Sequence, residues 1–174
     1  MTSNIQIRRY QPNDIDAVYE AVIESKPELS PWMPWCQTEY AWQDAADWVQ
    51  GRPEAWERNE EKSFLMIDAN DRLLGSCGIH RIDARNGVGE LGYWVRSSAT
   101  CQGIATEATR QVARWAFQEA NFHRIEILVS VENLASQRVA EKAGAIREGV
   151  LRDRILLHER RHDCVLYALL NNQF

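Results

Sequence analysis

The residues best suited to chemistry stand where a predicted strand passes into a long predicted helix. Residues 90–108 read as the end of the strand, a short polar loop and the first turns of a helix that begins at Gly103. The first turn of a helix has free N–H groups and a partial positive charge, and a loop without bulky side chains lets those groups contact a phosphate. The Walker A pattern is absent from this loop. The segment therefore indicates an anion site, although glycine at this place also fits an ordinary strand-to-helix loop.

Two side chains close to this loop could also take part in a reaction. The strand period of two places Glu90, Gly92 and Trp94 on one face. A carboxylate on a mostly apolar strand must be solvated or paired, so we expect Glu90 either to face a cleft or to form a salt bridge at an edge. Cys101 precedes the helix N-terminus, where thiol pKa values fall, and it is either a reactive thiol or a small residue tolerated in the loop.

The elements that must position these residues form one mixed α/β pattern. Period-two runs, helical spacings and turn signals predict the order β-α-α-β-β-β-α-β-α-β-β. Gly51 and Pro53 are expected to break the second helix. The predicted strands cover residues 5–10, 63–69, 72–82, 88–96, 123–131, 145–156 and 163–170; the helices cover 15–25, 42–56, 103–120 and a last stretch from the cap Asn133 to Gly144.

Composition bounds the class of protein. The chain has 174 residues, of which 45% are hydrophobic and 26% charged, as is typical of one globular domain over residues 1–174. No apolar run approaches the ~18 residues of a membrane span and the first residues lack a secretory pattern, so we expect a cytoplasmic protein without a membrane partner. The net charge of −5 argues against a nucleic-acid partner. The cysteines form no C-x-x-C pair, and the sequence predicts no metal site.

Three segments resemble a known family. Residues 90–95 and 102–108 (ELGYWV and QGIATEA) look like motif A of the GNAT acyltransferases, and residues 133–145, followed by 147–152, look like motif B. Residues 29–35 (LSPWMPW) resemble the tryptophan–proline segment of the RimJ/RimL-like branch, which acetylates the N-termini of ribosomal proteins. The segments occur in the right order over nearly the whole chain, which is thus similar to a GNAT N-acetyltransferase.

The resemblance implies a fold and a co-substrate. The fold is a mostly antiparallel sheet of about seven strands flanked by helices, with splayed central strands that form a V-shaped cleft for acetyl-CoA. The chain departs from the usual motif at Thr100 and Cys101, where arginine or glutamine commonly comes first. Backbone donors need no particular side chain, so we expect CoA binding to persist, more weakly. The likeness places the pantetheine beside the backbone of Tyr93, Trp94 and Val95, and the pyrophosphate on the N–H groups of Gln102, Gly103, Ile104, Ala105 and Thr106.

The resemblance also assigns roles in motif B. In RimJ/RimL-like enzymes a serine three residues after the motif's asparagine points at the cofactor sulfur, so Ser136 is the candidate acid that protonates the departing thiolate. The alternative is that Ser136 is simply a polar residue of the first helical turn. Asn133 fits both a helix N-cap and, by likeness, a pantetheine contact.

The candidate base is Glu90, acting directly or through water. Some relatives carry a glutamate on the strand after motif B, where this chain has Ile155, and nearby Asp153 is the fallback base. Tyr93 points away from the face of Glu90, and we interpret its side chain as packing.

The acceptor is less well defined. In this family the segment between the first strand and the second helix borders the acceptor site, so we expect Trp32 or Trp35 to line its mouth. The favoured acceptor is the α-amino group of a protein or peptide N-terminus. A small-molecule amine, such as an antibiotic or metabolite, and a non-catalytic acyl-CoA-binding sensor remain as alternatives, and both a monomer and a homodimer are open.

Charge is unevenly distributed along the chain. Residues 1–90 carry a net charge of −7 and residues 91–174 a net charge of +2. Motifs A and B, which should hold the polyanionic acetyl-CoA, lie in the second part, and the segments expected near the acceptor lie in the first. Unless this asymmetry is chance, it predicts a cationic acceptor.

Overall fold

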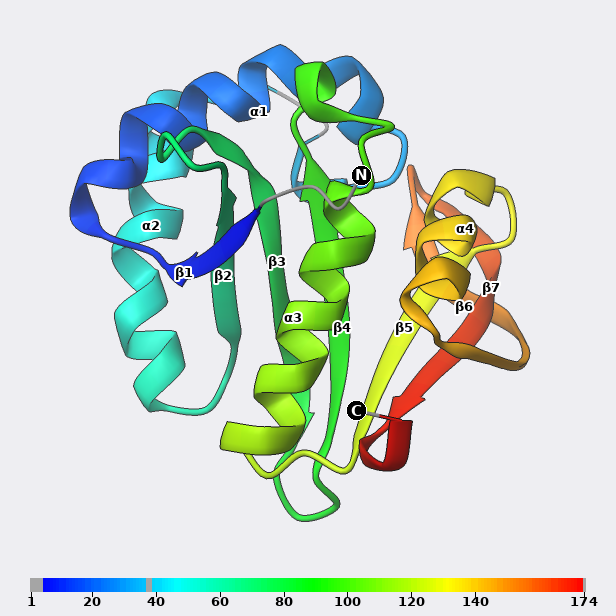
Figure 1. Cartoon of the computed structure of the whole chain (residues 1–174). Helices are drawn as coiled ribbons and strands as arrows, with labels where there is room; N and C mark the ends of the chain where they lie inside the picture. The colour runs from blue at the N-terminus through cyan, green and yellow to red at the C-terminus, as the bar shows by residue number, and fades with distance from the viewer. Residues whose placement is uncertain (1–4, 37–38, 174) are drawn as a thin grey trace.

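Seven strands form one mixed sheet in the computed structural model, which describes residues 5–36 and 39–173 (Figure 1). The spatial order is β1-β2-β3-β4-β5-β7-β6, and β4 with β5 is the parallel pair among antiparallel ones. The strands are β1 (Gln6–Arg9), β2 (Lys62–Ile67), β3 (Leu73–Asp83), β4 (Val88–Val95), β5 (Arg124–Ser130), β6 (Ile146–Leu157) and β7 (Arg160–Leu170).

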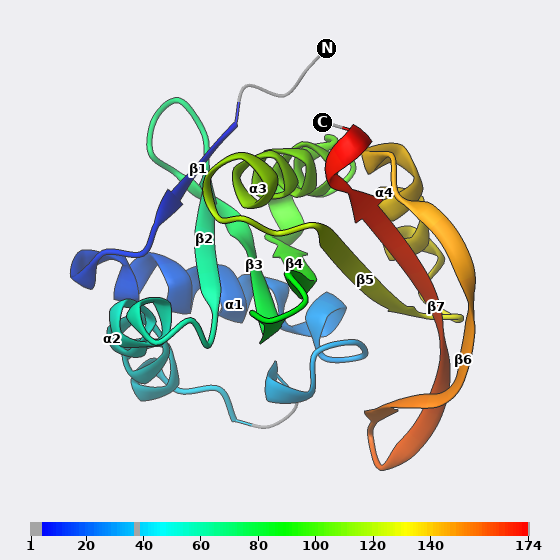
Figure 2. The ribbon, with the colours of Figure 1, turned by 90° about the horizontal axis from the view of Figure 1, so that it is seen from below.

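Four helices cover the two faces of the sheet. Figure 2 shows α1 and α2 on one side, and α3 and α4 on the other. Each side has its own buried apolar cluster: Val22 and Leu65 belong to the α1–α2 cluster, and Val112 and Ile125 to the α3–α4 cluster. The helices are α1 (Ile15–Leu29), α2 (Trp42–Glu57), α3 (Ile104–Glu119) and α4 (Leu134–Ala143).

The sheet forks between β4 and β5. Their parallel pairing covers Val88 to Glu90 on β4, facing Arg124 to Glu126 on β5, and the described residues form no further pair between these strands. Beyond this point the strands diverge (Figure 1), so each presents an unpaired backbone edge to the other. The mostly antiparallel sheet, the four helices and the splayed central strands are thus as the sequence predicts.

α1 is longer than predicted, and α2 is not broken where the sequence predicts a break. α1 continues past residue 25, through Pro27 to Leu29, and α2 continues through Gly51 and Pro53 to Glu57. A proline costs an interior helix position ~3 kcal/mol and a glycine ~1 kcal/mol. Burial of the apolar face of each helix, including Leu29, offsets these costs, because tertiary packing supplies most of the stability of helices in proteins.

The last hairpin is also longer than predicted. β7 begins at Arg160, not at 163, because the chain reverses at His158 and Glu159. Both residues have positive φ angles, 49° and 60°, as a tight type I′ hairpin turn requires. The usual sequence signal for that turn is Asn-Gly or Asp-Gly, which this chain lacks here.

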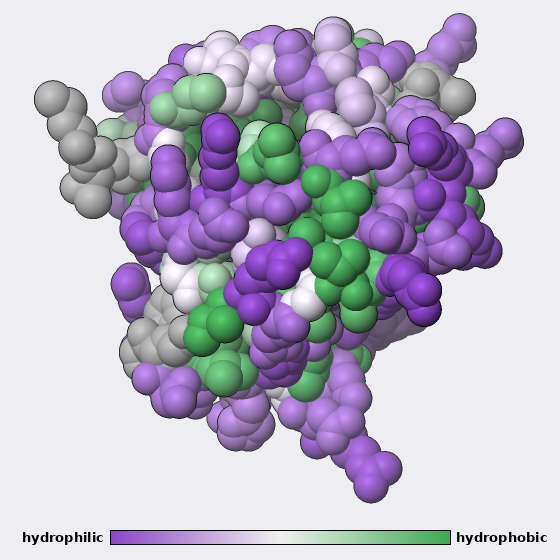
Figure 3. All heavy atoms as spheres, turned by 90° about the vertical axis from the view of Figure 1, so that its right-hand side faces the viewer, coloured by the Kyte–Doolittle hydropathy of each residue, from purple (hydrophilic) through white to green (hydrophobic). Residues whose placement is uncertain are grey.

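The side of the molecule formed by α4 and the β6–β7 hairpin carries apolar side chains within a largely polar surface (Figure 3). The exposed large apolar residues on these elements are Leu134, Ile146, Val150 and Leu156. β6 is the edge strand of the sheet, so the side chains of β6 lack a neighbouring strand on one side. In the described part of the chain, no helix has the length and apolar character needed to cross a membrane.

Candidate active site

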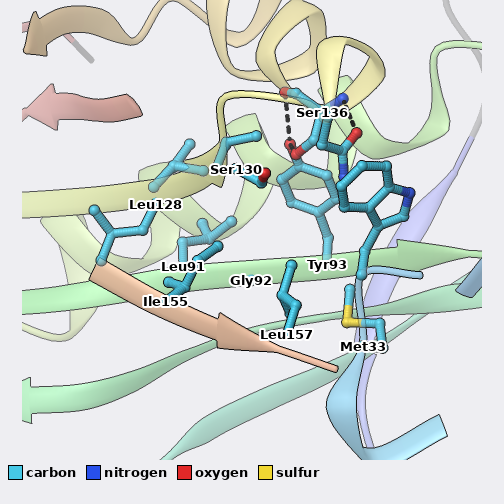
Figure 4. Close-up of a pocket in the computed structure, with 13 residues that line it drawn as sticks. Met33, Leu91, Gly92, Tyr93, Leu128, Ser130, Ser136, Ile155 and Leu157 are labelled. Carbon is cyan, nitrogen blue, oxygen red and sulfur yellow. Dashed lines mark hydrogen bonds between the residues drawn. The ribbon is translucent and has the colours of Figure 1, made fainter. Parts of the chain in front are cut away.

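A cavity of about 110 Å³ opens at the fork of the sheet. Both diverging strands, the start of α4, strand β6 and the segment after α1 contribute to its wall (Figure 4). Its lining residues are Trp32, Met33, Leu91, Gly92, Tyr93, Ile127, Leu128, Val129, Ser130, Asn133, Ser136, Ile155 and Leu157. Most of these side chains are apolar, so the few hydroxyl and amide groups among them are the ones able to do chemistry.

Ser136 and Tyr93 bring two hydroxyl groups together in this cavity. The Tyr93 hydroxyl lies 2.8 Å from Ser136 Oγ and 3.1 Å from the Ser136 carbonyl oxygen (Figure 4). Burial is the main cause that raises the pKa of Tyr93 to about 12, so the phenol keeps its proton at neutral pH. The sequence interpretation of the Tyr93 side chain as packing is therefore incomplete, because its polar end reaches the candidate acid.

Asn133 fixes the start of α4 and hence the place of Ser136. Its Oδ1 accepts a hydrogen bond of 3.0 Å from the Ser136 N–H, as the predicted N-cap requires. Gly144 ends the helix with a φ of 99°, as the sequence also predicts. Both Asn133 and Ser136 line the cavity, so the predicted contact of Asn133 with pantetheine requires only that pantetheine enter the cavity.

Beyond the fork, β4 has an unpaired backbone edge at the residues predicted to contact pantetheine. Tyr93, Trp94 and Val95 pair on one side with β3, opposite Cys77, Ser76 and Gly75. Their other side faces the diverged β5, with which these residues form no pair. Backbone groups on this free edge are available to an extended ligand that adds to the sheet.

The loop before α3, where the phosphate site is predicted, contains two residues with left-handed backbone angles. Cys101 and Gly103 both have positive φ angles, 60° and 78°, and glycine adopts such an angle without strain. The first helical hydrogen bond runs from Glu107 N–H to Gly103 O. The N–H groups of Ile104 and its next two neighbours, Ala105 and Thr106, therefore precede the helical bonding pattern.

Two adjacent residues of α1 accept hydrogen bonds from the loop that precedes α3. Glu24 accepts hydrogen bonds from Arg96 Nε at 2.5 Å and from Ser98 N–H at 2.9 Å. These bonds from Ser98, and then from Arg96, lower the pKa of Glu24 to about 2. Ser25 Oγ accepts from the Ser97 N–H at 2.9 Å, so two adjacent residues of α1 anchor residues 96–98.

Glu90 lies at the point of the fork and is paired. Its carboxylate is 3.3 Å from His80 Nε2 and 3.0 Å from Arg81 Nη1, and it is not among the cavity-lining residues. Burial alone would raise the pKa of Glu90, but the hydrogen bond and charge of His80, with those of Arg81, outweigh burial and lower it. The sequence predicts that Glu90 either faces a cleft or forms a salt bridge, and the structure shows the salt bridge.

Strand β6 contributes an apolar wall to the cavity. Ile155 lines the cavity, whereas the fallback base Asp153 is exposed on a bulge and does not. Directly opposite Ile155 in the hairpin lies His162, whose Nδ1 is 3.6 Å from Glu132 Oε2. His162 is not among the cavity-lining residues, and sequence reasoning missed its pairing with Ile155 because only the register of the hairpin shows it.

The two tryptophans predicted to border the acceptor site lie in different positions relative to the cavity. Trp32 lines the cavity together with Met33, which sequence reasoning missed. Trp35 lies outside the cavity wall, 48% exposed, with its ring centroid 6.3 Å from that of Trp94 and 6.0 Å from that of Tyr40. Figure 2 shows the β6–β7 hairpin tip bending toward the side of the sheet that carries this segment.

Comparison with known proteins gives one family for most of the chain. Residues 4–146 match the family described as Acetyltransferase (GNAT) domain. YdaF of Bacillus subtilis (strain 168), provisionally named a ribosomal N-acetyltransferase, is 29% identical over 100% of this chain and 95% of its own. The ribosomal-protein-serine acetyltransferase of Escherichia coli (strain K12) is 29% identical over 97% of this chain and 93% of its own.

The architecture also has a close counterpart among solved structures. RimL, a ribosomal L7/L12 alpha-N-protein acetyltransferase solved in complex with coenzyme A, superposes with a TM-score of 0.89. The match covers 98% of this chain and 95% of that chain at 24% sequence identity. This likeness shows a shared fold.

Proposed function

The chain belongs to the GNAT acetyltransferase family, and from that premise we propose that it transfers the acetyl group of acetyl-CoA to the N-terminal α-amino group of a protein or peptide. The observation that carries the proposal is the cavity at the sheet fork, where the Ser136 and Tyr93 hydroxyls meet beside a free strand edge. The names of the two full-length relatives, both ribosomal acetyltransferases, support a protein acceptor.

The residues around the fork fit acetyl-CoA. The free edge of β4 suits the amide groups of pantetheine, which can pair with Tyr93 and Val95 as an added strand would. The N–H groups before the first bond of α3 suit the pyrophosphate, because the helix dipole favours negative charge there. Bound in this way, acetyl-CoA supplies an acetyl group activated as a thioester. Residues proposed for the phosphate site are Gln102, Gly103, Ile104, Ala105 and Thr106.

Two side chains handle protons in this proposal. Ser136 holds a proton at Oγ in the cavity and delivers it to the sulfur of the departing thiol. Glu90, whose lowered pKa keeps it ionised and which lies outside the cavity wall, acts through a water that takes the proton from the attacking amine. A lowered pKa makes Glu90 a weak base by itself, which favours the water-mediated route over direct proton abstraction.

The acceptor mouth is proposed between the segment after α1 and the β6–β7 hairpin. Trp32 and Met33 contribute one wall of the cavity and Ile155 and Leu157 the other. Trp35, exposed beside Trp94, is proposed to contact the residues that follow the reacting amine. An extended peptide fits between such walls, whereas a small amine would use only the cavity itself.

The acceptor class is tested by product analysis. Unblocked peptides, the same peptides with a blocked α-amine, and small amines are incubated with the protein and acetyl-CoA, and mass spectrometry locates the acetyl group. We expect acetylation at the α-amine of the unblocked peptides. Preferential acetylation of small amines would make the chain a small-molecule acetyltransferase, and binding of acetyl-CoA without any product would make it a sensor.

A further inference from the structure

We propose that the Tyr93 hydroxyl is a positioning group for Ser136, so that the acid of the reaction consists of two hydroxyls rather than one. The inference rests on the proposed function. It starts from the contact on the cavity wall, where the Tyr93 hydroxyl lies 2.8 Å from Ser136 Oγ. Tyr93 comes from β4 and Ser136 from α4, the helix that follows β5, so the contact links the two sides of the fork.

The phenol proton decides where the serine proton points. Tyr93 lies within hydrogen-bond distance of both Ser136 Oγ and the Ser136 carbonyl oxygen, at 2.8 and 3.1 Å, and has one proton to donate. If the phenol donates to the carbonyl, the serine proton is directed to the phenol oxygen and away from the cavity. If the phenol donates to Oγ, the serine proton is free to point into the cavity, toward the place of the thiol.

The same hydrogen bond stabilises the serine after its proton has left. In the proposed step the Ser136 O–H bond breaks and an S–H bond forms on the thiol, which leaves negative charge on Oγ. The phenol is the stronger acid of the two hydroxyls, so it shares its proton with Oγ as that charge develops, and hydrogen bonds to charged groups are stronger than neutral ones. The proton lost by the acceptor nitrogen returns to Oγ through water, so the reaction is balanced and Tyr93 ends as it began.

The structure offers a matched control for this pair. Tyr10 donates a hydrogen bond of 2.7 Å to Ser76 Oγ, the same two residue types at nearly the same distance. Tyr10 is buried in the α1–α2 core cluster and does not line the cavity at the fork. Removing each phenol hydroxyl by Tyr→Phe therefore separates a role in the reaction from the general cost of losing a buried hydrogen bond.

The test is a double-mutant cycle of Tyr93→Phe and Ser136→Ala, with amine-dependent thiol release from acetyl-CoA as the rate and calorimetry for acetyl-CoA affinity. We expect Tyr93→Phe to lower kcat about tenfold, with a dissociation constant for acetyl-CoA within about twofold of the unmodified protein. Adding it to Ser136→Ala should lower kcat no further, because residues that act as one unit are not additive. Tyr10→Phe should leave kcat unchanged. Tyr93→Met, which keeps bulk without a hydroxyl, should repeat the Tyr93→Phe result.

Three outcomes overturn the inference. One is full activity of Tyr93→Phe, and another is an equal loss when Tyr93→Phe is added to Ser136→Ala, since both make the hydroxyls independent. The third is a loss of acetyl-CoA affinity as large as the loss of kcat, which would mean that Tyr93 only shapes the binding site. Absence of amine-dependent thiol release from the unmodified protein would instead contradict the proposed function itself.

Discussion

Single residues define what the cavity can do, and Ser136 is the central one. Its backbone N–H is held by Asn133 and its hydroxyl by Tyr93, so both the backbone and the side chain of Ser136 are held in place at the cavity. Ser136 also stands three residues after Asn133, the spacing that resembles the acid of the RimJ/RimL-like branch. Geometry and resemblance thus converge on one oxygen atom.

Ser136→Ala should lower kcat by roughly 10²-fold with little change in acetyl-CoA affinity, because general acid catalysis acts on the transition state. Steady-state kinetics together with calorimetry measures the two quantities separately. Ser130→Ala, a change of the same type on the cavity wall, serves as the control. A Ser136→Ala protein that retains its kcat would mean that Ser136 is only a polar residue of the helix start.

Glu90→Gln should lower kcat/KM at neutral pH by roughly 10²-fold. The loss should shrink as pH rises, because a larger fraction of the acceptor amine is then already neutral. Asp153→Asn, which changes an exposed carboxylate on β6, should have little effect. If Glu90→Gln retains full activity and His162→Gln does not, the base is the imidazole opposite Ile155 instead.

At the scale of elements, the N-terminus of α3 and the loop before it should bind the charged part of acetyl-CoA. Gly103→Val should raise the acetyl-CoA dissociation constant at least about tenfold, or ~1.4 kcal/mol. Valine at the φ of 78° is strained, and its side chain blocks close approach of a phosphate. Calorimetry on the folded variant measures the change, with circular dichroism to establish folding. Unchanged affinity would place the phosphate elsewhere.

The anchor between α1 and the loop gives a second prediction at this scale. Glu24→Gln should raise the acetyl-CoA dissociation constant by roughly threefold, because the surface ion pair with Arg96 contributes modestly. The carboxylate has a pKa of about 2 in the folded protein against its usual 4.5, so its stabilising effect is present above pH 4.5 and is lost as pH falls toward 2. The difference in thermal unfolding temperature between the two proteins should therefore be seen at pH 7 and fade in acid.

Glu20→Gln is the control for Glu24→Gln, since it lies one turn earlier on the exposed side of α1. It should change neither affinity nor the pH dependence of unfolding. An equal effect of both variants would show that the net charge of α1, and not the anchor, is responsible.

The elements of this fold differ in how far the sequence predicts them. Strand periodicity and the cap pair Asn133 and Gly144 predict α4 and the central strands well, because these signals are local. The lengths of α1 and of β7 are mispredicted, since Pro27 and the turn at His158 give local signals that tertiary packing and hairpin pairing override.

Local sequence signals predict part of the candidate site, as they predict part of the fold. Motifs A and B mark residues of β4 and α4 that line the cavity at the fork, whereas the loop before α3, which motif A also marks, contributes none of the lining residues. The contact of Tyr93 with Ser136 and the apolar wall of Ile155 and Leu157 depend on how distant elements cross, and strand period alone says nothing of that. The salt bridge of Glu90 with Arg81 likewise depends on the irregular register of β3 with β4.

At the scale of the whole molecule, charge differs between the walls of the acceptor mouth. Residues 15–57, which form α1, α2 and their connection, contain nine Asp and Glu against two Lys and Arg. The β6–β7 hairpin is close to neutral, with five arginines (Arg147, Arg152, Arg154, Arg160 and Arg161) against four acidic residues (Glu148, Asp153, Glu159 and Asp163). The prediction of a cationic acceptor therefore requires that the acidic wall determine the electrostatic potential that the acceptor meets as it approaches.

If it does, peptides with basic residues after the reacting amine should have a higher kcat/KM than acidic ones at low salt. This advantage should fall as salt rises while kcat changes little, because charge steering is screened over about 8 Å at physiological ionic strength. Rates for a matched basic and acidic peptide over a salt series measure it. Equal acetylation of both peptides at low salt would contradict the prediction.

The most direct test of the account is the stoichiometry of thiol release from acetyl-CoA in the presence of an unblocked peptide. The account predicts one free thiol for each acetylated α-amine, almost none with the same peptide blocked at its N-terminus, and a rate reduced roughly 10²-fold in Ser136→Ala. Saturable binding of acetyl-CoA with no peptide-dependent thiol release over the full set of amines would contradict it, and would leave the fork as a binding site without chemistry.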